Sequence, residues 1–192
     1  MAARWPQTYV TVSCSINAMK KIAIFCSSSE NINPEYTAAA RLVVEGLCHK
    51  GYGIVSGGSY RGTMGTVSDA VKAAGGYHKG VLPEFMLTFV YDGLSEVVWT
   101  KTMAERKEEM RRDTVAVIAL PGGTGTLDEL IETHVLRKLK QYGGRIIVLN
   151  TGGFYKPFKA LLDHYVSEHM LTPEDRDLIE FHDTPEALLG TF

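Results

Sequence analysis

Residues 114–129, TVAVIALPGGTGTLDE, decide the fold, because an apolar run, a glycine-rich turn and a helix-forming segment follow one another there. Thr114 to Leu120 is β-branched or apolar almost throughout, which is typical of a strand buried on both faces. Pro121 to Gly125 contains three glycines, and helical periodicity begins at Thr126. A strand that leads through a short turn into a helix is characteristic of βαβ units and predicts a parallel sheet.

The same alternation extends in both directions from this stretch. Most of the expected strands are separated by amphipathic segments rather than by hairpin turns, so right-handed crossovers should connect them. The sequence therefore predicts an α/β fold of one domain, a doubly wound, mostly parallel, Rossmann-like sheet. Strands are expected at residues 22–26, 53–55, 78–82, 96–99, 114–120 and 146–149, and helices at 34–50, 63–74, 103–112, 126–141 and 155–169.

Composition limits the functions that the chain can have. With 192 residues, 45% of them hydrophobic, it can bury one sizeable core. The formal net charge of −2 gives no field that would favour nucleic acid or an anionic membrane, and no apolar run reaches the roughly 18 to 20 residues of a membrane span. Three cysteines without metal-ligand spacing favour reduced thiols in the cytoplasm.

The first 18 residues are set apart from the predicted domain, 19–192. They include Arg4, Trp5 and several Ser and Thr but no acid. We expect a disordered N-terminal extension; a transit peptide is the alternative, although one Arg in this segment supports it only weakly.

Two glycine-rich loops stand where a parallel sheet places its ligands, beyond the carboxyl ends of the strands. One is the turn quoted above, and the other is SGGSYRGTMG at residues 56–65. Glycines let a backbone approach closely, and N–H groups at a helix N-terminus attract phosphate. Neither loop is a P-loop or a Gly-x-Gly-x-x-Gly fingerprint. Tight packing of strand against helix is the alternative explanation of both.

Glu129 has two interpretations. Thr126 and Glu129 have the spacing of a capping box, in which the two side chains bond the first amides of a helix. The carboxylate also lies one turn from a glycine loop at the ligand edge of the sheet, where it could act in catalysis. Glu132 follows one turn later on the same face.

A third segment, MAERKEEM at residues 103–110, also allows two interpretations. Arg106 could pair with Glu109, and Glu108 with Arg112, on a solvated helix face. Alternatively, Arg106 and Lys107 lie at the start of a crossover helix over the same ligand edge, where an Arg can bind phosphate or orient a carboxylate.

Together, the three segments resemble the LOG (Lonely Guy) family of cytokinin riboside 5′-monophosphate phosphoribohydrolases, from about Lys20 to the C-terminus. The signature is Pro-Gly-Gly-x-Gly-Thr-x-x-Glu with an upstream Arg-Lys pair. The resemblance implies hydrolysis of a nucleoside 5′-monophosphate at its N-glycosidic bond, without metal or cofactor, by a homodimer with its sites near the subunit interface. It implies Arg106 and Glu129 as the catalytic pair, and as substrate-binding or phosphate-binding residues Gly57, Gly58, Gly62, Met64, Gly65, Lys107, Gly122, Gly123, Thr124, Gly125 and Thr126; Ser28 and Glu132 are further candidates.

The sequence departs from the family pattern in places. Ser27 stands where the family has Gly, in Cys-Gly-Ser-Ser, and Ser59 and Thr63 replace a Gly and a Leu in the first loop. These departures leave the catalytic pair in place but bear on the base pocket, so the preference for a prenylated adenine is less secure than the hydrolysis. A non-catalytic nucleotide-binding or cofactor-binding protein of the same fold is the alternative. A pyridoxal phosphate decarboxylase is a second rival, for which the sequence offers no supported Schiff-base lysine.

Overall fold

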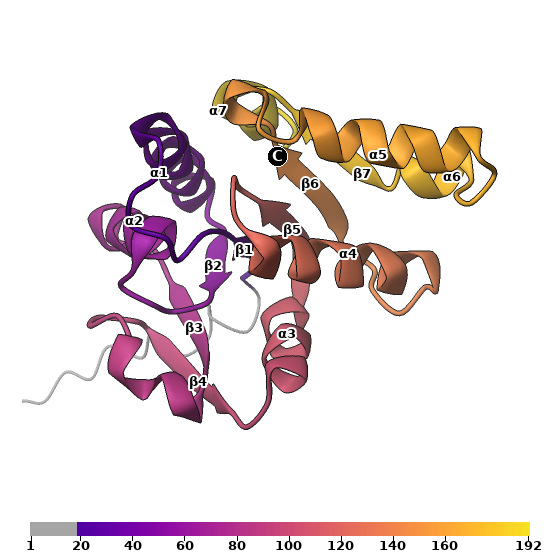
Figure 1. Cartoon of the computed structure of the whole chain (residues 1–192). Helices are drawn as coiled ribbons and strands as arrows, with labels where there is room; N and C mark the ends of the chain where they lie inside the picture. The colour runs from indigo at the N-terminus through magenta and orange to yellow at the C-terminus, as the bar shows by residue number, and fades with distance from the viewer. Residues whose placement is uncertain (1–18) are drawn as a thin grey trace, which may run out of the picture.

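The computed structural model describes residues 19–192 and consists of a seven-stranded parallel sheet with helices on both faces (Figure 1). The sheet order is β4-β3-β2-β1-β5-β6-β7, and every neighbouring pair is parallel. The predicted fold class is confirmed. The strands are β1 (Lys21–Phe25), β2 (Gly53–Ser56), β3 (His78–Pro83), β4 (Glu96–Thr100), β5 (Thr114–Ala119), β6 (Arg145–Leu149) and β7 (Ile179–His182).

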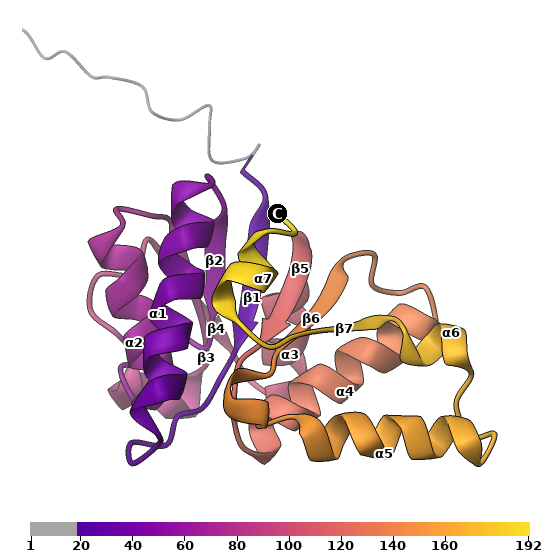
Figure 2. The same ribbon diagram turned by 90° about the horizontal axis from the view of Figure 1, so that it is seen from above.

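Two helical layers cover the sheet, as Figures 1 and 2 show from two directions. Alternate residues of a strand face opposite sides, so Ile22 and Ile24 of β1 join one core cluster while Ala23 and Phe25 join the other. The first cluster includes residues of α1 (Pro34–His49), α2 (Gly62–Ala73) and α7 (Pro185–Leu189). The second includes residues of α3 (Met103–Arg111), α4 (Thr124–Lys138) and α5 (Lys156–Ser167).

The structure adds elements to the predicted fold and corrects the start of one helix. The C-terminal strand β7 and the short helices α6 (Pro173–Arg176) and α7 were not expected from the sequence, nor were the 3₁₀ segments η2 (Glu84–Phe89) and η3 (Thr151–Gly153). The helix after the quoted turn begins at Thr124 rather than Thr126, with Gly123 as its N-cap. The expectation of a disordered extension at residues 1–18 lies outside the described residues.

The strand order places the ligand edge. From β1 the chain runs outward in one direction through β2, β3 and β4, and then returns to add β5, β6 and β7 on the other side. Ligands of such sheets bind beyond the carboxyl ends of the strands at this reversal, which here lies between β1 and β5. No helix in the described part of the chain is long and apolar enough to cross a membrane.

Candidate active site

A cavity of about 330 Å³ lies at the reversal point of the sheet, which is a size that fits a small ligand. It brings together the loop after β1, the first glycine loop, η2 and the starts of α3 and α4. The residues that line it are Cys26, Ser27, Ser28, Ser29, Gly57, Ser59, Arg61, Met64, Met86, Phe89, Met103, Arg106, Gly123, Thr124, Gly125, Thr126, Asp128 and Glu129.

A buried ion pair forms part of the cavity wall. Nη1 of Arg106, from α3, donates to Oε1 of Glu129, from α4, over 2.7 Å, and both side chains are less than a tenth exposed. Nε of Arg106 donates to the Val81 carbonyl at 3.1 Å, which fixes the guanidinium against β3. Gly57 leaves room for this arrangement, because a Cβ there would collide with the guanidinium. The pairing of Arg106 with Glu109 is therefore wrong; Glu108 does pair with Arg112, at 3.2 Å.

Burial raises the pKa of Glu129, while the neighbouring Arg106 and Lys107 oppose this shift by favouring the carboxylate. A carboxyl group with a raised pKa is a stronger base once it is ionised, and Arg106 keeps the ionised form accessible. Burial also raises the pKa of the Cys26 thiol, with a contribution from the charge of Glu129. Cys26 is therefore a neutral thiol in the cavity wall at neutral pH.

The N-terminus of α4 opens into the cavity. Its N-cap, Gly123, makes no side-chain cap, and an ideal Cβ built on Gly123 or Gly125 would meet no atom within 4 Å. Within residues 19–192, the N–H groups of Thr124, Gly125 and Thr126 have no backbone or side-chain acceptor. Unpaired amides at a positive helix end favour an anion. The capping-box interpretation of Thr126 and Glu129 is wrong, since the cap position is Gly123; a capping box forms instead at Thr102 and Glu105 of α3.

Several predicted binding glycines lie beside the cavity rather than in its wall, and serve close packing. Gly58 has φ +65° and lies against Gly80, whose Cα would be 2.9 Å from an added Cβ. Gly62, with φ +55°, packs on the Ser28–Ser29 backbone, and Gly65 packs on the Tyr60 carbonyl. Gly122 packs in the same way against the side chain of Thr126. From the first loop, the predicted residues that reach the lining are Gly57 and Met64.

Lys107 and Glu132 also lie outside the lining. Nζ of Lys107 contacts Oδ2 of Asp128 at 2.9 Å and Oε2 of Glu132. The other oxygen of Glu132, Oε1, accepts a hydrogen bond from Nη2 of Arg111 at 2.7 Å. Burial lowers the pKa of Lys107, but hydrogen bonds to Glu132 and Asp128 raise it more, so the net shift is upward. These ion pairs tie α3 to α4 and thereby support the geometry of Arg106 and Glu129.

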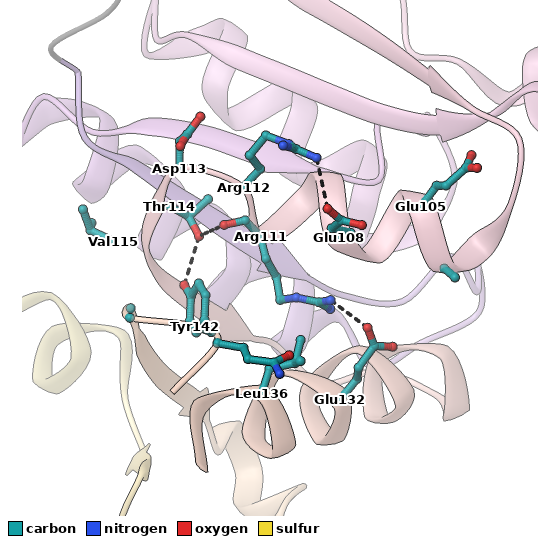
Figure 3. Close-up of a pocket in the computed structure, with 14 residues that line it drawn as sticks. Glu105, Glu108, Arg111, Arg112, Asp113, Thr114, Val115, Glu132, Leu136 and Tyr142 are labelled. Carbon is teal, nitrogen blue, oxygen red and sulfur yellow. Dashed lines mark hydrogen bonds and ion pairs between the residues drawn. The ribbon is translucent and has the colours of Figure 1, made fainter. Parts of the chain in front are cut away.

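A larger hollow of about 900 Å³ lies on the outer side of the α3–α4 contact (Figure 3). Arg111 points across it to Glu132, and Thr114 joins the Arg111 carbonyl to the Tyr142 hydroxyl. Its charged residues have mixed signs and are largely paired with one another. It holds neither the glycine turn nor Glu129, so the smaller cavity is the candidate active site.

Sequence reasoning missed several residues of the lining. Arg61 stands inside the first glycine loop, so its place in the sequence could have indicated that it lines the site. Met86 and Phe89 belong to η2, a 3₁₀ segment without periodicity. Backbone bonds from Tyr60 N to the Phe89 carbonyl and from Tyr91 N to the Gly58 carbonyl bring η2 onto that loop, and only the tertiary fold reveals them.

Comparison with known proteins supports the family resemblance that the three sequence segments indicated. The profile of the family described as "Possible lysine decarboxylase" matches residues 64–192. The chain is 36% identical over 172 residues to the probable cytokinin riboside 5′-monophosphate phosphoribohydrolase LOGL5 of Oryza sativa subsp. japonica, covering 88% of this chain and 70% of the relative. It is 36% identical over 162 residues to cytokinin riboside 5′-monophosphate phosphoribohydrolase LOG7 of Arabidopsis thaliana, covering 83% and 75%.

Solved structures share the fold at lower identity. The molybdenum cofactor binding protein of Rippkaea orientalis superposes with a TM-score of 0.68 at 21% identity, over 90% of this chain and 94% of that one. The molybdenum cofactor carrier protein of Chlamydomonas reinhardtii gives a TM-score of 0.68 at 18% identity, over 90% and 95%. The sheet order, the glycine turn followed by Glu129, and the matches over most of the chain lead to one conclusion: the protein belongs to the LOG family, which carries the older description of possible lysine decarboxylases.

Proposed function

We propose that the protein hydrolyses the N-glycosidic bond of a nucleoside 5′-monophosphate whose base is an N6-modified adenine, releasing the free base, a cytokinin, and ribose 5-phosphate. The observation that carries the proposal is the buried Arg106–Glu129 pair in the wall of a cavity that also receives the open N-terminus of α4. Relatives that are 36% identical are named for this reaction, and their names supply the base.

The chemistry follows from the positions of these groups. Cleavage of an N-glycosidic bond passes through an oxocarbenium-like transition state, which a nearby carboxylate stabilises. Glu129 would face the anomeric carbon and take a proton from the attacking water. The water oxygen bonds to that carbon as the carbon–nitrogen bond breaks, and the departing base receives the proton. Arg106 orients Glu129 and favours its ionised form, which opposes the upward pKa shift that burial causes.

The lining of the cavity offers groups for both the phosphate and the base of the substrate. The amides of Thr124, Gly125 and Thr126 offer donors to a 5′-phosphate at a positive helix end. Apolar side chains from three different elements offer a surface to a purine and its prenyl tail: Met64, Met86 and Met103. Each buried methylene of a tail contributes up to about 0.8 kcal/mol to binding. Ser28 remains a candidate for the phosphate or ribose hydroxyls, since it lines the cavity.

The older family description implies pyridoxal phosphate, and the cavity does not fit that group. No lysine of residues 19–192 is among those that line it. Lys107 is held by Asp128 and Glu132, and Lys79, which is buried, donates to Glu109 at 2.6 Å. A Schiff base therefore has no lysine in the cavity, and no step is assigned to this cofactor.

We further propose that the protein acts as a homodimer through the outer face of α4. Leu127, Ile131 and Val135 follow one another at intervals of four residues, and each is between 37% and 46% exposed. Leu139, just after the helix, is 61% exposed. An apolar stripe of this kind is costly in water and typical of a contact surface. A second copy there would lie beside the start of α4 and thus near the site.

We place the activity in the cytoplasm, which the free thiols of Cys26 and Cys48 support.

A product assay tests the proposed function. The full chain is incubated with N6-isopentenyladenosine 5′-monophosphate, AMP and the two matching nucleosides, and free base and ribose 5-phosphate are separated by chromatography. We expect release from the monophosphates only, with a higher kcat/KM for the prenylated one. Nucleotide binding without base release would show a binding protein of the same fold. Preference for AMP would leave the hydrolysis standing and reject the cytokinin assignment.

A further inference from the structure

Arg61 lines the candidate active site from the first glycine loop, directly before α2. Its Nε donates to Oε1 of Glu30 at 3.2 Å, and its guanidinium carbon lies 5.3 Å from the centre of the Phe89 ring. The side chain of Arg61 is 41% exposed and that of Glu30 is 62% exposed. Glu30 itself is not part of the cavity wall. The guanidinium is therefore oriented by an aromatic ring at the rim of the cavity and held there by an exposed ion pair.

The other cationic side chains near the cavity are already paired with carboxylates. Arg106 is bound to Glu129 in a buried pair, and Lys107 is bound to Asp128 and Glu132 outside the cavity wall. In the described part of the chain, the two Nη atoms of Arg61 have no protein hydrogen-bond acceptor. These are the atoms with which a guanidinium forms a fork to a phosphate. Exposed ion pairs contribute little free energy, so Arg61 can release Glu30 and bind a phosphate at small cost.

The geometry of the first loop explains why a charge is useful here. The start of α2 is covered, because Gly62 packs directly on the backbone of Ser28 and Ser29. At the start of α2 the Met64 amide donates to the Ser27 carbonyl at 3.2 Å, whereas at the start of α4 three successive amides, those of Thr124, Gly125 and Thr126, have no acceptor within residues 19–192. A phosphate carries close to two negative charges, more than the partial charge of one helix end offsets. A second cationic group in the cavity wall would supply the remainder.

From these observations we propose that Arg61 is a specificity-determining residue, whose guanidinium binds the substrate's 5′-phosphate and makes the site select nucleotides over nucleosides. This inference rests on the proposed function for the identity of the substrate. It assigns to Arg61 the phosphate-binding role that the sequence alone had given to Lys107. Phe89 acts through Arg61 as a positioning residue, since its ring keeps the guanidinium plane in place.

Binding measurements test this without requiring turnover. Dissociation constants of AMP and of adenosine are measured by titration calorimetry for the wild type, Arg61→Ala and Arg61→Lys, with thermal melting as a check of folding. We expect Arg61→Ala to reduce the preference for AMP over adenosine by about tenfold to a hundredfold, the range for a hydrogen bond to a charged group. Arg61→Lys keeps the charge but not the fork, so its preference should be intermediate.

Glu30→Gln is the matched control, because it releases Arg61 without removing it, and it should bind AMP as well as the wild type or better. An equal loss of AMP and adenosine binding in Arg61→Ala would show a structural role and overturn the proposal, as would unchanged binding of both. Failure of the proposed function gives a different result: a wild type that binds AMP through Arg61 but releases no base from any nucleotide.

Discussion

Replacing Arg106 by Met tests the buried ion pair most directly, because it removes the charge while keeping an apolar side chain of similar length. Glu129 would then be a buried carboxylate without its partner, and the Val81 carbonyl would lose the donor that is now 3.1 Å away. Breaking a buried pair from one side costs about 3–5 kcal/mol of unfolding free energy when the remaining group stays charged. We expect a loss of this size at pH 8.

The loss should depend on pH in a defined direction. Burial already raises the pKa of Glu129, and removal of Arg106 raises it further. A group with a raised pKa in the folded state stabilises the fold fully below its unfolded pKa of about 4.3, and this contribution is lost as pH rises through the folded pKa. Near pH 4.5 Glu129 is largely protonated in the folded variant, so the charge penalty is small. The missing bond to Val81 remains and costs about 1 kcal/mol.

The assay is urea-induced unfolding of the wild type and Arg106→Met at pH 8 and pH 4.5. The double variant Arg106→Met/Glu129→Gln is the control. It has no buried carboxylate at position 129, so its loss of unfolding free energy should be nearly independent of pH. An equal loss for the single variant at both pH values would refute the argument that Glu129 is held as a buried carboxylate by Arg106. Base release by the single variant at pH 7 should fall at least about a hundredfold, or about 2.7 kcal/mol in the barrier.

Three further predictions concern the same helices. Glu129→Gln should abolish base release while AMP binding stays within about tenfold of the wild type, because Gln is nearly isosteric but cannot take the proton; more than about a tenth of the wild-type rate in the product assay would make Glu129 structural. In the wild type, the acidic limb of kcat/KM against pH should lie above the ordinary glutamate pKa, since burial raises the pKa of Glu129 and the ionised form is the active one; a limb at or below pH 4.5, measured across pH 4 to 8, would reject this. Ile131→Glu, which places a charge in the apolar stripe of α4, should convert the proposed dimer to monomer in analytical ultracentrifugation, whereas Arg41→Glu on α1 should not; unchanged assembly in both variants would move the interface elsewhere.

Much of the fold follows from the sequence because five of its seven strands are largely buried on both faces. Apart from their first residues, Lys21 and Thr114, strands β1 and β5 are apolar, and the predicted limits agree with the structure to within one residue. The edge strand β7 escaped prediction for the opposite reason. It has four residues, IEFH, of which Glu180 pairs with Arg145 on the neighbouring strand, so its pattern has no continuous apolar run.

Predictions from helical spacing were wrong where contacts between distant parts of the chain decide which side chains pair. Helical spacing predicted that Arg106 pairs with Glu109. In the structure Glu109 forms ion pairs with Lys79 and Arg112, and Arg106 forms its ion pair with Glu129 on another helix. The same rules made Thr126 a helix cap, whereas the chain enters the helix two residues earlier. For Arg106, burial against a second helix, which a single sequence does not report, outweighed its neighbours in the chain.

The sequence by itself determined the order of strands and helices as far as α5, the glycine turn before Glu129, and the presence of Arg106 upstream of that turn, because periodicity and backbone freedom are local properties. Only the tertiary structure decided that α3 and α4 meet at the reversal point of the sheet. As a result, Nη1 of Arg106 lies 2.7 Å from Oε1 of Glu129. It also decided which glycines pack and which face the cavity, and that Arg61 rather than Lys107 lines it. The physical reason is that burial and charge pairing depend on which elements share a face, and that is set by the packing of the whole sheet.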